Sequence, residues 1–235
     1  MKNREPFINP VKQASVQDLV YEELLQAILS GRIHPGQKIT IEGAAKLLQV
    51  SLMPVRVALQ KLGAGGFVTI AKNRRITANE LTPDDLKEIT ELRLLVECYA
   101  AEKACLSRSR ASVKELEKLC RECVEAPDSD EYIKANRKFH GWIYHQAGRP
   151  LMEEVINGLW QRVSPYLHIL LRKEEQWRSG TFARNHEGMV KAFRDQDPQR
   201  IREWLTKDLS VASDRIQGLL HGARKESRAA ARGLF

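Results

Sequence analysis

The spacing of apolar residues predicts a first region built from short helices and a β-hairpin. Apolar positions recur three and four residues apart after Ser15, which indicates a helix that ends at Gly31. The same reasoning predicts two further helices and two short strands, over about 41–48, about 53–62, 67–70 and 75–78. Three helices followed by a hairpin is the element order of a winged helix-turn-helix domain. We expect residues 15–79 to form this domain, after a tail at 1–14.

Residues 80–221 give almost no strand pattern and a succession of helical ones. The run Thr82-Pro-Asp-Asp85 is a strong helix start, with a capping threonine, a proline and two acids that complement the helix dipole. The predicted helices are separated by Pro- or Gly-containing breaks and cover 83–106, 112–125, 129–147, 150–176, 181–196 and 198–221. We therefore expect a mainly α protein whose C-terminal part is an all-helical antiparallel bundle, ending in a basic tail at 222–235.

Positive charge is concentrated in the first region. The net charge of the chain is +8, and residues 1–79 carry 11 Lys and Arg against 5 Asp and Glu. Residues 80–221 carry 23 basic and 24 acidic side chains, and no acidic residue occurs between Gly43 and Asn79. A basic module beside a nearly neutral body is typical of a phosphate-binding domain joined to a second domain. The alternative is a solvated surface that is basic without function.

Composition excludes several other classes. Hydrophobic residues make up 43% and charged residues 29% of the 235 residues, which argues against a disordered chain. No apolar run approaches the ~18 residues that a membrane span needs, and the N-terminus lacks a signal-peptide core, so we expect no membrane association. Four cysteines are too few for a disulfide scaffold of this size, which favours a reduced, cytoplasmic protein.

The winged helix-turn-helix prediction implies double-stranded DNA as partner. In such domains the N-terminal end of the third helix enters the major groove, and the hairpin tip lies along the phosphate backbone. The polar and basic residues that we expect to contact an operator are Lys46, Ser51, Arg56, Gln60, Lys61, Lys72, Arg74 and Arg75.

The helical region contains a set of residues with metal-ligand spacing. Asn136 and His140 are four apart, so their side chains share one helix face. His186 and Asp208 lie equally far before and after the expected turn at Asp197, which places them at the same height of a helical hairpin. Four O and N donors can thus converge, a set suited to Zn²⁺, Ni²⁺ or Mn²⁺. The alternative is a polar cavity that binds an organic acid through its side chains alone.

Two segments carry a family resemblance. The stretch Val20–Ile70, with "GRIHPG", "AAKLL" and "VSLMPVRVAL", resembles the DNA-binding domain of GntR-family bacterial transcription regulators. The following helices resemble the FCD-type ligand-binding domain of the FadR-like branch, through "ELRLLVECYAAEKA", "NRKFH" and "NHEGMVKAF". The resemblance covers about residues 15–215. It implies a homodimeric transcription regulator, not an enzyme, that is controlled by a small carboxylate effector.

The resemblance also implies roles for residues of the helical domain. Metal-binding members typically use an Asp or Asn and a His four apart, followed by two His on later helices. Asn136, His140 and His186 match this pattern, and Asp208 stands where His is usual.

Three further residues are candidate effector contacts, and the resemblance implies this role for Arg93 alone. The arginine that matches Arg93 tends to face the effector cavity, although an ion pair with Glu97 is an alternative role for it. Arg162 and Tyr166, four apart on one helix, could line the cavity as well, with core packing or a surface position as the alternative.

The recognition segment departs from the family pattern. Leu52, Met53 and Val57 replace the usual Arg, Thr and Glu, and Gly43 stands where an Arg is common. Lost arginines remove phosphate contacts and guanine recognition, so we expect an operator that differs from the common one of the family.

Two other features of the sequence suggest functions other than transcription regulation. A metal-dependent hydrolytic enzyme could use the Asn/His/His/Asp set, but no general base accompanies it and the basic module would have no role. The pair Cys120 and Cys123 forms a CxxC motif, yet it lies inside a predicted helix without a second pair, which favours core packing.

Overall fold

The computed structural model describes residues 15–173 and 180–232, the last ten of these by their backbone alone. These residues form two compact units. The first ends at Asn79 and the second begins at Glu80, with residues 29–31 also belonging to the second unit.

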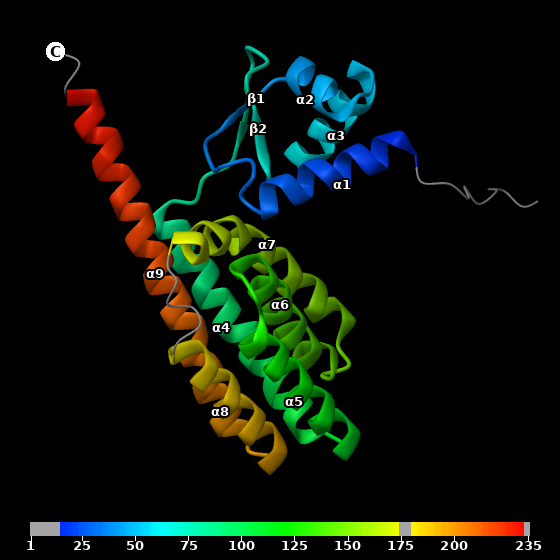
Figure 1. Ribbon diagram of the computed structural model, residues 1–235, viewed down its shortest axis with the longest axis vertical. Coiled ribbons are helices and arrows are strands. Elements are labelled where there is room, and N and C mark those ends of the chain that lie inside the picture. The colour runs from blue at the N-terminus through cyan, green and yellow to red at the C-terminus, as the bar shows by residue number, and fades with distance from the viewer. Residues whose placement is uncertain (1–14, 174–179, 233–235) are drawn as a thin grey trace, which may run out of the picture. The chain divides into compact units, whose positions relative to one another are not determined.

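The first unit is a winged helix-turn-helix (Figure 1). Its helices and strands are α1 (Val16–Leu29), β1 (Lys38–Ile39), α2 (Ile41–Leu48), α3 (Leu52–Ala64), β2 (Val68–Ile70) and β3 (Ile76–Ala78). The strands form an antiparallel sheet in the order β1-β3-β2, in which Lys38 pairs with Thr77 and Val68 with Ala78. Strand β1 was not predicted, because two residues are too few to produce an alternating pattern.

Side-chain capping explains where two of these helices begin. The Ser15 hydroxyl accepts from the Asp18 amide at 3.3 Å, and Thr40 caps α2 by accepting from the Gly43 amide at 3.1 Å. The start of α3 differs from expectation. Ser51 occupies the N-cap position but makes no side-chain cap bond. Pro54 occupies the third helical position and has no N–H, so the usual target of a capping hydroxyl is missing.

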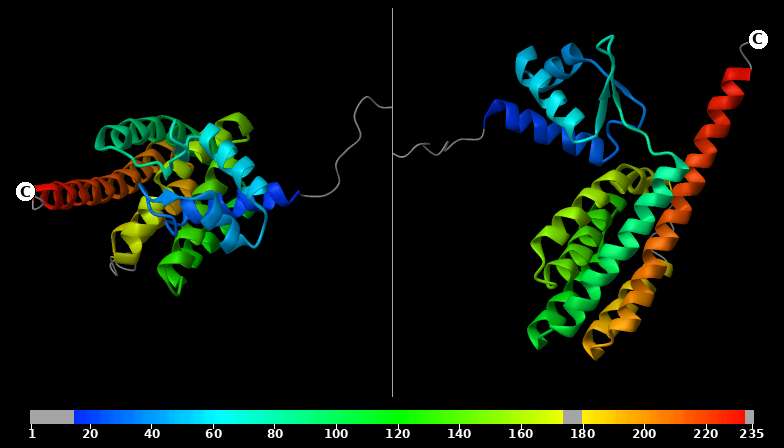
Figure 2. Two further views of the ribbon diagram at one scale, coloured as in Figure 1. Left: turned by 90° about the horizontal axis from the view of Figure 1, so that it is seen from above. Right: turned by 180° about the vertical axis from the view of Figure 1, so that it is seen from behind.

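The second unit is entirely helical within its described residues. Its elements are α4 (Pro83–Leu106), α5 (Arg110–Glu125), α6 (Ser129–His145), α7 (Pro150–Lys173), α8 (Thr181–Asp195) and α9 (Pro198–Arg232). Figure 2 shows α8 and α9 as an antiparallel hairpin that lies alongside α4. Among the helices described, none is both long and apolar enough to cross a membrane.

The predicted end of the last helix at residue 221 is wrong, because α9 continues to Arg232 through most of the basic segment 222–235. Residues 223–232 are rich in Ala, Arg, Lys and Glu, which have high helix propensity, and contain neither Gly nor Pro. Gly222 alone costs about 1 kcal/mol, too little to end a long helix. Residues 1–14, the predicted N-terminal tail, lie outside the described residues.

Candidate functional site: a buried His-His-Asp cluster and a basic helix-wing face

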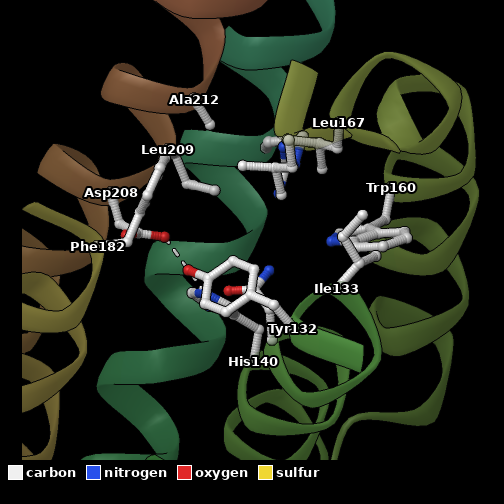
Figure 3. Close-up of a pocket in the computed structure, with 12 residues that line it drawn as sticks. Tyr132, Ile133, His140, Trp160, Leu167, Phe182, Asp208, Leu209 and Ala212 are labelled. Carbon is white, nitrogen blue, oxygen red and sulfur yellow. Dashed lines mark ion pairs between the residues drawn. The ribbon is translucent and has the colours of Figure 1, made fainter. Parts of the chain in front are cut away.

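Helices α6, α8 and α9 bring together His140, His186 and Asp208 inside the second unit. Figure 3 shows two of them, His140 and Asp208. The His140 Nε2 atom lies 3.3 Å from Asp208 Oδ2, and His186 Nε2 lies 4.0 Å from Asp208 Oδ1. One ligand atom from each residue falls within 4.8 Å of the others. All three side chains are buried. The arrangement is a possible metal site of two imidazoles and one carboxylate.

Close packing of α8 on α9 sets this geometry. The indole ring of Trp204 on α9 lies directly against Gly188 on α8, where any Cβ atom would overlap the ring. The ring of Phe139, beside His140 on α6, stacks on the His186 ring with centroids 4.4 Å apart. Gly188 therefore allows α8 and α9 to pack closely, and the contact with Phe139 fixes the orientation of the His186 ring.

The electrostatics of His186 and Asp208 suit a cation. Burial lowers the pKa of His186 to about 4, so its imidazole is neutral at pH 7. Burial alone would raise the pKa of Asp208, but the hydrogen bond from His140 and the nearby imidazoles hold it below its ordinary value. His186 Nε2 is buried and has no hydrogen-bond partner among the described residues. An unpartnered buried nitrogen facing a carboxylate fits a divalent ion.

Two asparagines flank the cluster. Asn136 lies one turn before His140 and lines the same cavity, so its amide can supply a further donor. Asn185 is buried and donates to Asp208 Oδ1 at 3.3 Å. Sequence reasoning missed Asn185, because equal distance from the turn at Asp197 pairs Asp208 with His186 and does not show how the two helices are rotated.

A hydrogen-bonded chain connects the cluster to a buried ion pair. Arg93 Nε donates to Glu97 Oε1 at 2.6 Å, and Glu97 is fully buried. The Tyr144 hydroxyl donates to the Glu97 carboxylate and lies 3.3 Å from Nδ1 of His140. Tyr144 follows His140 by four residues, a spacing that could have identified it from the sequence. Arg93 pairs with Glu97 and also lines the cavity. Its contact with an effector stays a prediction.

The cavity beside the cluster has a polar end and an apolar wall (Figure 3). Arg93, Asn136, His140 and Asp208 form the polar end. The other lining residues are Tyr132, Ile133, Trp160, Leu167, Leu171, Phe182, Leu209 and Ala212. The enclosed volume is about 30 Å³, which holds one or two water molecules. An organic ligand requires these side chains to move apart.

The structure corrects the expectation that Arg162 and Tyr166 line this cavity. The Tyr166 hydroxyl accepts a hydrogen bond from the Leu81 amide at 2.6 Å, and Arg162 is exposed. Helix α7 turns Trp160, Leu167 and Leu171 toward the cavity, and at 3.6 residues per turn positions 162 and 166 then lie on other faces.

In the first unit, all eight residues expected to contact DNA are exposed. Arg56 and Gln60 lie on the exposed side of α3, opposite the buried side chains of Val55 and Leu59. Lys61 differs from the others because its ammonium group forms an ion pair with Asp18 at 2.9 Å. That pairing offsets its charge and reduces its expected value as a phosphate contact.

The hairpin between β2 and β3 presents three basic side chains. The Ala71 amide donates to the Arg75 carbonyl at 2.9 Å, and the Arg74 amide donates back to the Ala71 carbonyl at 2.9 Å. Arg74 has a left-handed backbone with φ of 61°, which is uncommon for a residue with a Cβ atom. The turn leaves Lys72, Arg74 and Arg75 exposed. This is the position of a wing that follows a phosphate backbone.

The cysteines are buried and unpaired. Cys120 and Cys123 lie on the inward side of α5, and burial raises their pKa values to about 11 and about 12. A thiol that stays protonated at pH 7 is a poor redox group and a poor metal ligand. The burial of both thiols therefore agrees with the prediction that they pack in the core.

Comparison with known protein families gives matches over both units. A model described as "Bacterial regulatory proteins, gntR family" matches residues 17–77. A model described as "FCD domain" matches residues 88–210, about half of the chain.

Individual relatives share this organisation. The HTH-type transcriptional regulator McbR of Escherichia coli K12 is 26% identical over 205 residues, covering 86% of this chain and 93% of McbR. The solved structure of E. coli McbR/YncC covers 90% of this chain and 100% of that one, with a TM-score of 0.73 at 25% identity. The gluconate operon transcriptional repressor of Bacillus subtilis is 24% identical over 228 residues, covering 93% of each chain.

Proposed function

Since the chain belongs to the gntR family of bacterial regulatory proteins with an FCD domain, and is therefore a DNA-binding transcription regulator, we propose that a small carboxylate controls it through a metal-containing site. The family and the named relatives are transcription regulators and not enzymes. They give no support to the hydrolytic alternative. The observation that carries the proposal is the buried, unpartnered Nε2 of His186 beside Asp208.

The metal ligands in this proposal are His140, His186 and Asp208, with Asn136 as a further donor. Two imidazoles and one carboxylate suit Zn²⁺, Ni²⁺ or Mn²⁺. When bound, the ion would supply positive charge that attracts an anionic ligand. Asn185 and Tyr144 hold Asp208 and His140 in place from outside the ligand set, as partners of metal ligands commonly do.

Charge balance favours a ligand with a single carboxylate. Glu97 neutralises Arg93, and Asp208 offsets one charge of a divalent ion. One positive charge then remains in excess, and one carboxylate neutralises it.

The apolar wall of the cavity favours a hydrocarbon group on that acid. A hydroxyl buried there without a partner would cost about 1–3 kcal/mol. The effector that we propose is therefore an acid with a short aromatic or branched tail, not a sugar acid.

A homodimer is the second part of the proposal. Helix α4 exposes Leu92, Leu95, Tyr99 and Leu106, three, four and seven residues apart, on one side. Its opposite side packs in the core through buried residues such as Ala101. An apolar stripe at this spacing suits pairing with the same helix of a second copy. Two winged helices would then face the two halves of a palindromic operator in bacterial cytoplasm.

The dimer has a direct test. Leu95 is 66% exposed, so Leu95→Asp leaves the core intact and places a charge in the proposed interface. We expect light scattering to show half the mass of the wild type. Leu151→Asp on α7, at a position 78% exposed and away from the stripe, is the matched control. A dimeric Leu95→Asp protein with a wild-type circular dichroism spectrum would contradict this interface.

The effector proposal is tested on the full chain loaded with Zn²⁺, Ni²⁺ or Mn²⁺. Benzoate, phenylacetate and isobutyrate are compared with citrate, gluconate and tartrate by thermal shift and by DNA affinity. The DNA is a duplex selected by the protein from a random library. We expect the apolar monocarboxylates to raise the melting temperature and to change DNA affinity. A response to polyhydroxy acids alone would contradict the ligand class, and no response to any acid would contradict carboxylate control.

A further inference from the structure

Two large apolar side chains stand in solvent at the start of α3. Leu52 is 46% exposed and Met53 is 63% exposed. The core of the unit is built from other residues of α3, which are Val55, Ala58, Leu59 and Leu62. Exposed apolar side chains at the N-terminal end of a DNA-binding helix gain free energy when an apolar group of the DNA covers them.

These side chains share a face with the polar residues that we expect to contact bases. Met53, Arg56 and Gln60 are spaced by three and four residues and are all exposed, which makes them one stripe along α3. Leu52 lies one turn before Arg56 and flanks the same stripe. When the N-terminal end of α3 enters the major groove, Leu52 and Met53 reach the base edges together with Arg56.

The local backbone keeps this end of the helix ordered. Pro54 fixes its own φ angle inside the first turn. The Ser51 hydroxyl is not used for capping, so it is available to a phosphate oxygen. The segment from Gly43 to Asn79 contains no carboxylate, so no acidic side chain of this stretch repels the backbone of the DNA.

The major groove offers one apolar group that can match these side chains. Each base pair shows donors and acceptors there, and thymine alone adds a methyl group. Leu and Met cannot form hydrogen bonds to bases, but they can bury a methyl group. We propose that Leu52 and Met53 contact thymine methyl groups, so that each operator half-site carries thymines beside the base pair contacted by Arg56.

The proposal predicts a dependence on a single functional group of the DNA. Duplexes selected by the full-length protein are resynthesised with deoxyuridine in place of thymidine, which removes only the methyl groups. We expect each lost contact to weaken binding about fourfold at fixed salt, the effect of exposing one buried methyl-sized group. Substitution outside the half-sites should leave the affinity unchanged.

A double variant assigns the effect to these two side chains. The protein with Leu52→Ala and Met53→Ala should bind thymidine and deoxyuridine duplexes equally, while Arg56 and the wing still hold it on DNA. Leu151→Ala, at an exposed leucine of the other unit, should keep the wild-type preference. Circular dichroism checks that each variant is folded.

Three results would overturn the inference. The first is a selected half-site that lacks thymine beside the base pair contacted by Arg56. The second is equal affinity of the wild type for both duplexes, and the third is an undiminished methyl preference in the double variant. If the double variant binds DNA normally but loses a protein partner, the exposed pair is a protein contact instead. Failure to select any DNA sequence would contradict operator binding itself, and with it this inference.

Discussion

The hydroxyl of Tyr144 lies 3.3 Å from Nδ1 of His140, and it also donates a hydrogen bond to Glu97. One side chain therefore links the His-His-Asp cluster to the buried ion pair of Glu97 with Arg93. Both parts contribute to the polar end of one cavity through His140 and Arg93. A change in either part can be transmitted to the other through a single hydrogen-bonded group.

This link predicts that Tyr144→Phe weakens metal binding without unfolding the protein. The substitution leaves the ring in place and removes the hydroxyl beside His140 and Glu97. We expect the affinity for Zn²⁺ or Ni²⁺ to fall about 10- to 100-fold, the usual effect of losing a partner of a ligand. Competition with a chromophoric chelator measures it, and Tyr99→Phe, at an exposed tyrosine on α4, is the control. Equal affinities in both variants would remove this role from Tyr144.

Metal loading should stabilise the folded chain through His186. Zn²⁺ at 100 times its dissociation constant adds about 2.7 kcal/mol to the free energy of unfolding, which differential scanning fluorimetry detects as a higher melting temperature. His186→Ala should remove this increase, whereas His145→Ala, which alters an exposed histidine near Glu153, should retain it. Elemental analysis of the purified protein gives an independent measure. Wild-type protein with no thermal response to any of the three metals would contradict the site.

Arg56 and Lys61 should differ in their importance for DNA binding, although both are exposed on α3. Arg56→Ala is expected to abolish operator binding in a gel shift at moderate salt, because a lost arginine contact costs about 1–3 kcal/mol and phosphate contacts are screened. Lys61→Ala should have a small effect, since Asp18 already pairs with this ammonium. Unchanged binding by the Arg56 variant would contradict the assignment of α3 as the recognition helix.

Arg93 should contribute strongly to stability as well as to ligand binding. Arg93→Ala leaves the Glu97 carboxylate buried beside Tyr144 without its cation, which we expect to cost about 3–5 kcal/mol in urea unfolding. Combining Arg93→Met with Glu97→Gln removes both charges and should recover most of that loss. An Arg93→Ala protein with the same free energy of unfolding as the wild type would show that the ion pair does not stabilise the fold.

The buried thiols predict a loss of stability at alkaline pH. Burial raises the pKa of Cys123 to about 12 and that of Cys105 to about 11, whereas unfolded thiols ionise near 8.5. Between about pH 9 and 11 the unfolded state therefore releases protons first, and the free energy of unfolding falls as pH rises. At pH 8 the native protein should not react with Ellman's reagent, and urea should expose four thiols. Rapid labelling of the native protein would contradict their burial.

Local signals in the sequence were sufficient for most helix boundaries. Thr82 and Asp85 form the capping box that starts α4, which runs over 83–106 as predicted. Capping and turn signals act between residues a few positions apart, so they can be identified without the tertiary structure. The same holds for Asn136 and His140, whose spacing alone places them on one side of α6.

The symmetry of the helical hairpin predicted a contact between two residues that are far apart in the sequence. His186 and Asp208 are equidistant from the turn at Asp197, and the structure places their side chains 4.0 Å apart. This worked because a short turn fixes the register of two antiparallel helices. It gave no information on Asn185, which reaches Asp208 only because of how the two helices are rotated.

Contacts between distant segments could be decided only by the tertiary structure. The rotation of α7 in the bundle turns Trp160 to the cavity and leaves Arg162 in solvent. An amphipathic pattern shows which side of a helix is buried, but not which neighbour each buried residue meets. The sequence by itself thus determined most of the elements, the two regions and the members of the His-His-Asp cluster. Packing decided the surroundings of that cluster, including the Glu97–Tyr144–His140 chain, because side chains from separate helices meet only when those helices pack.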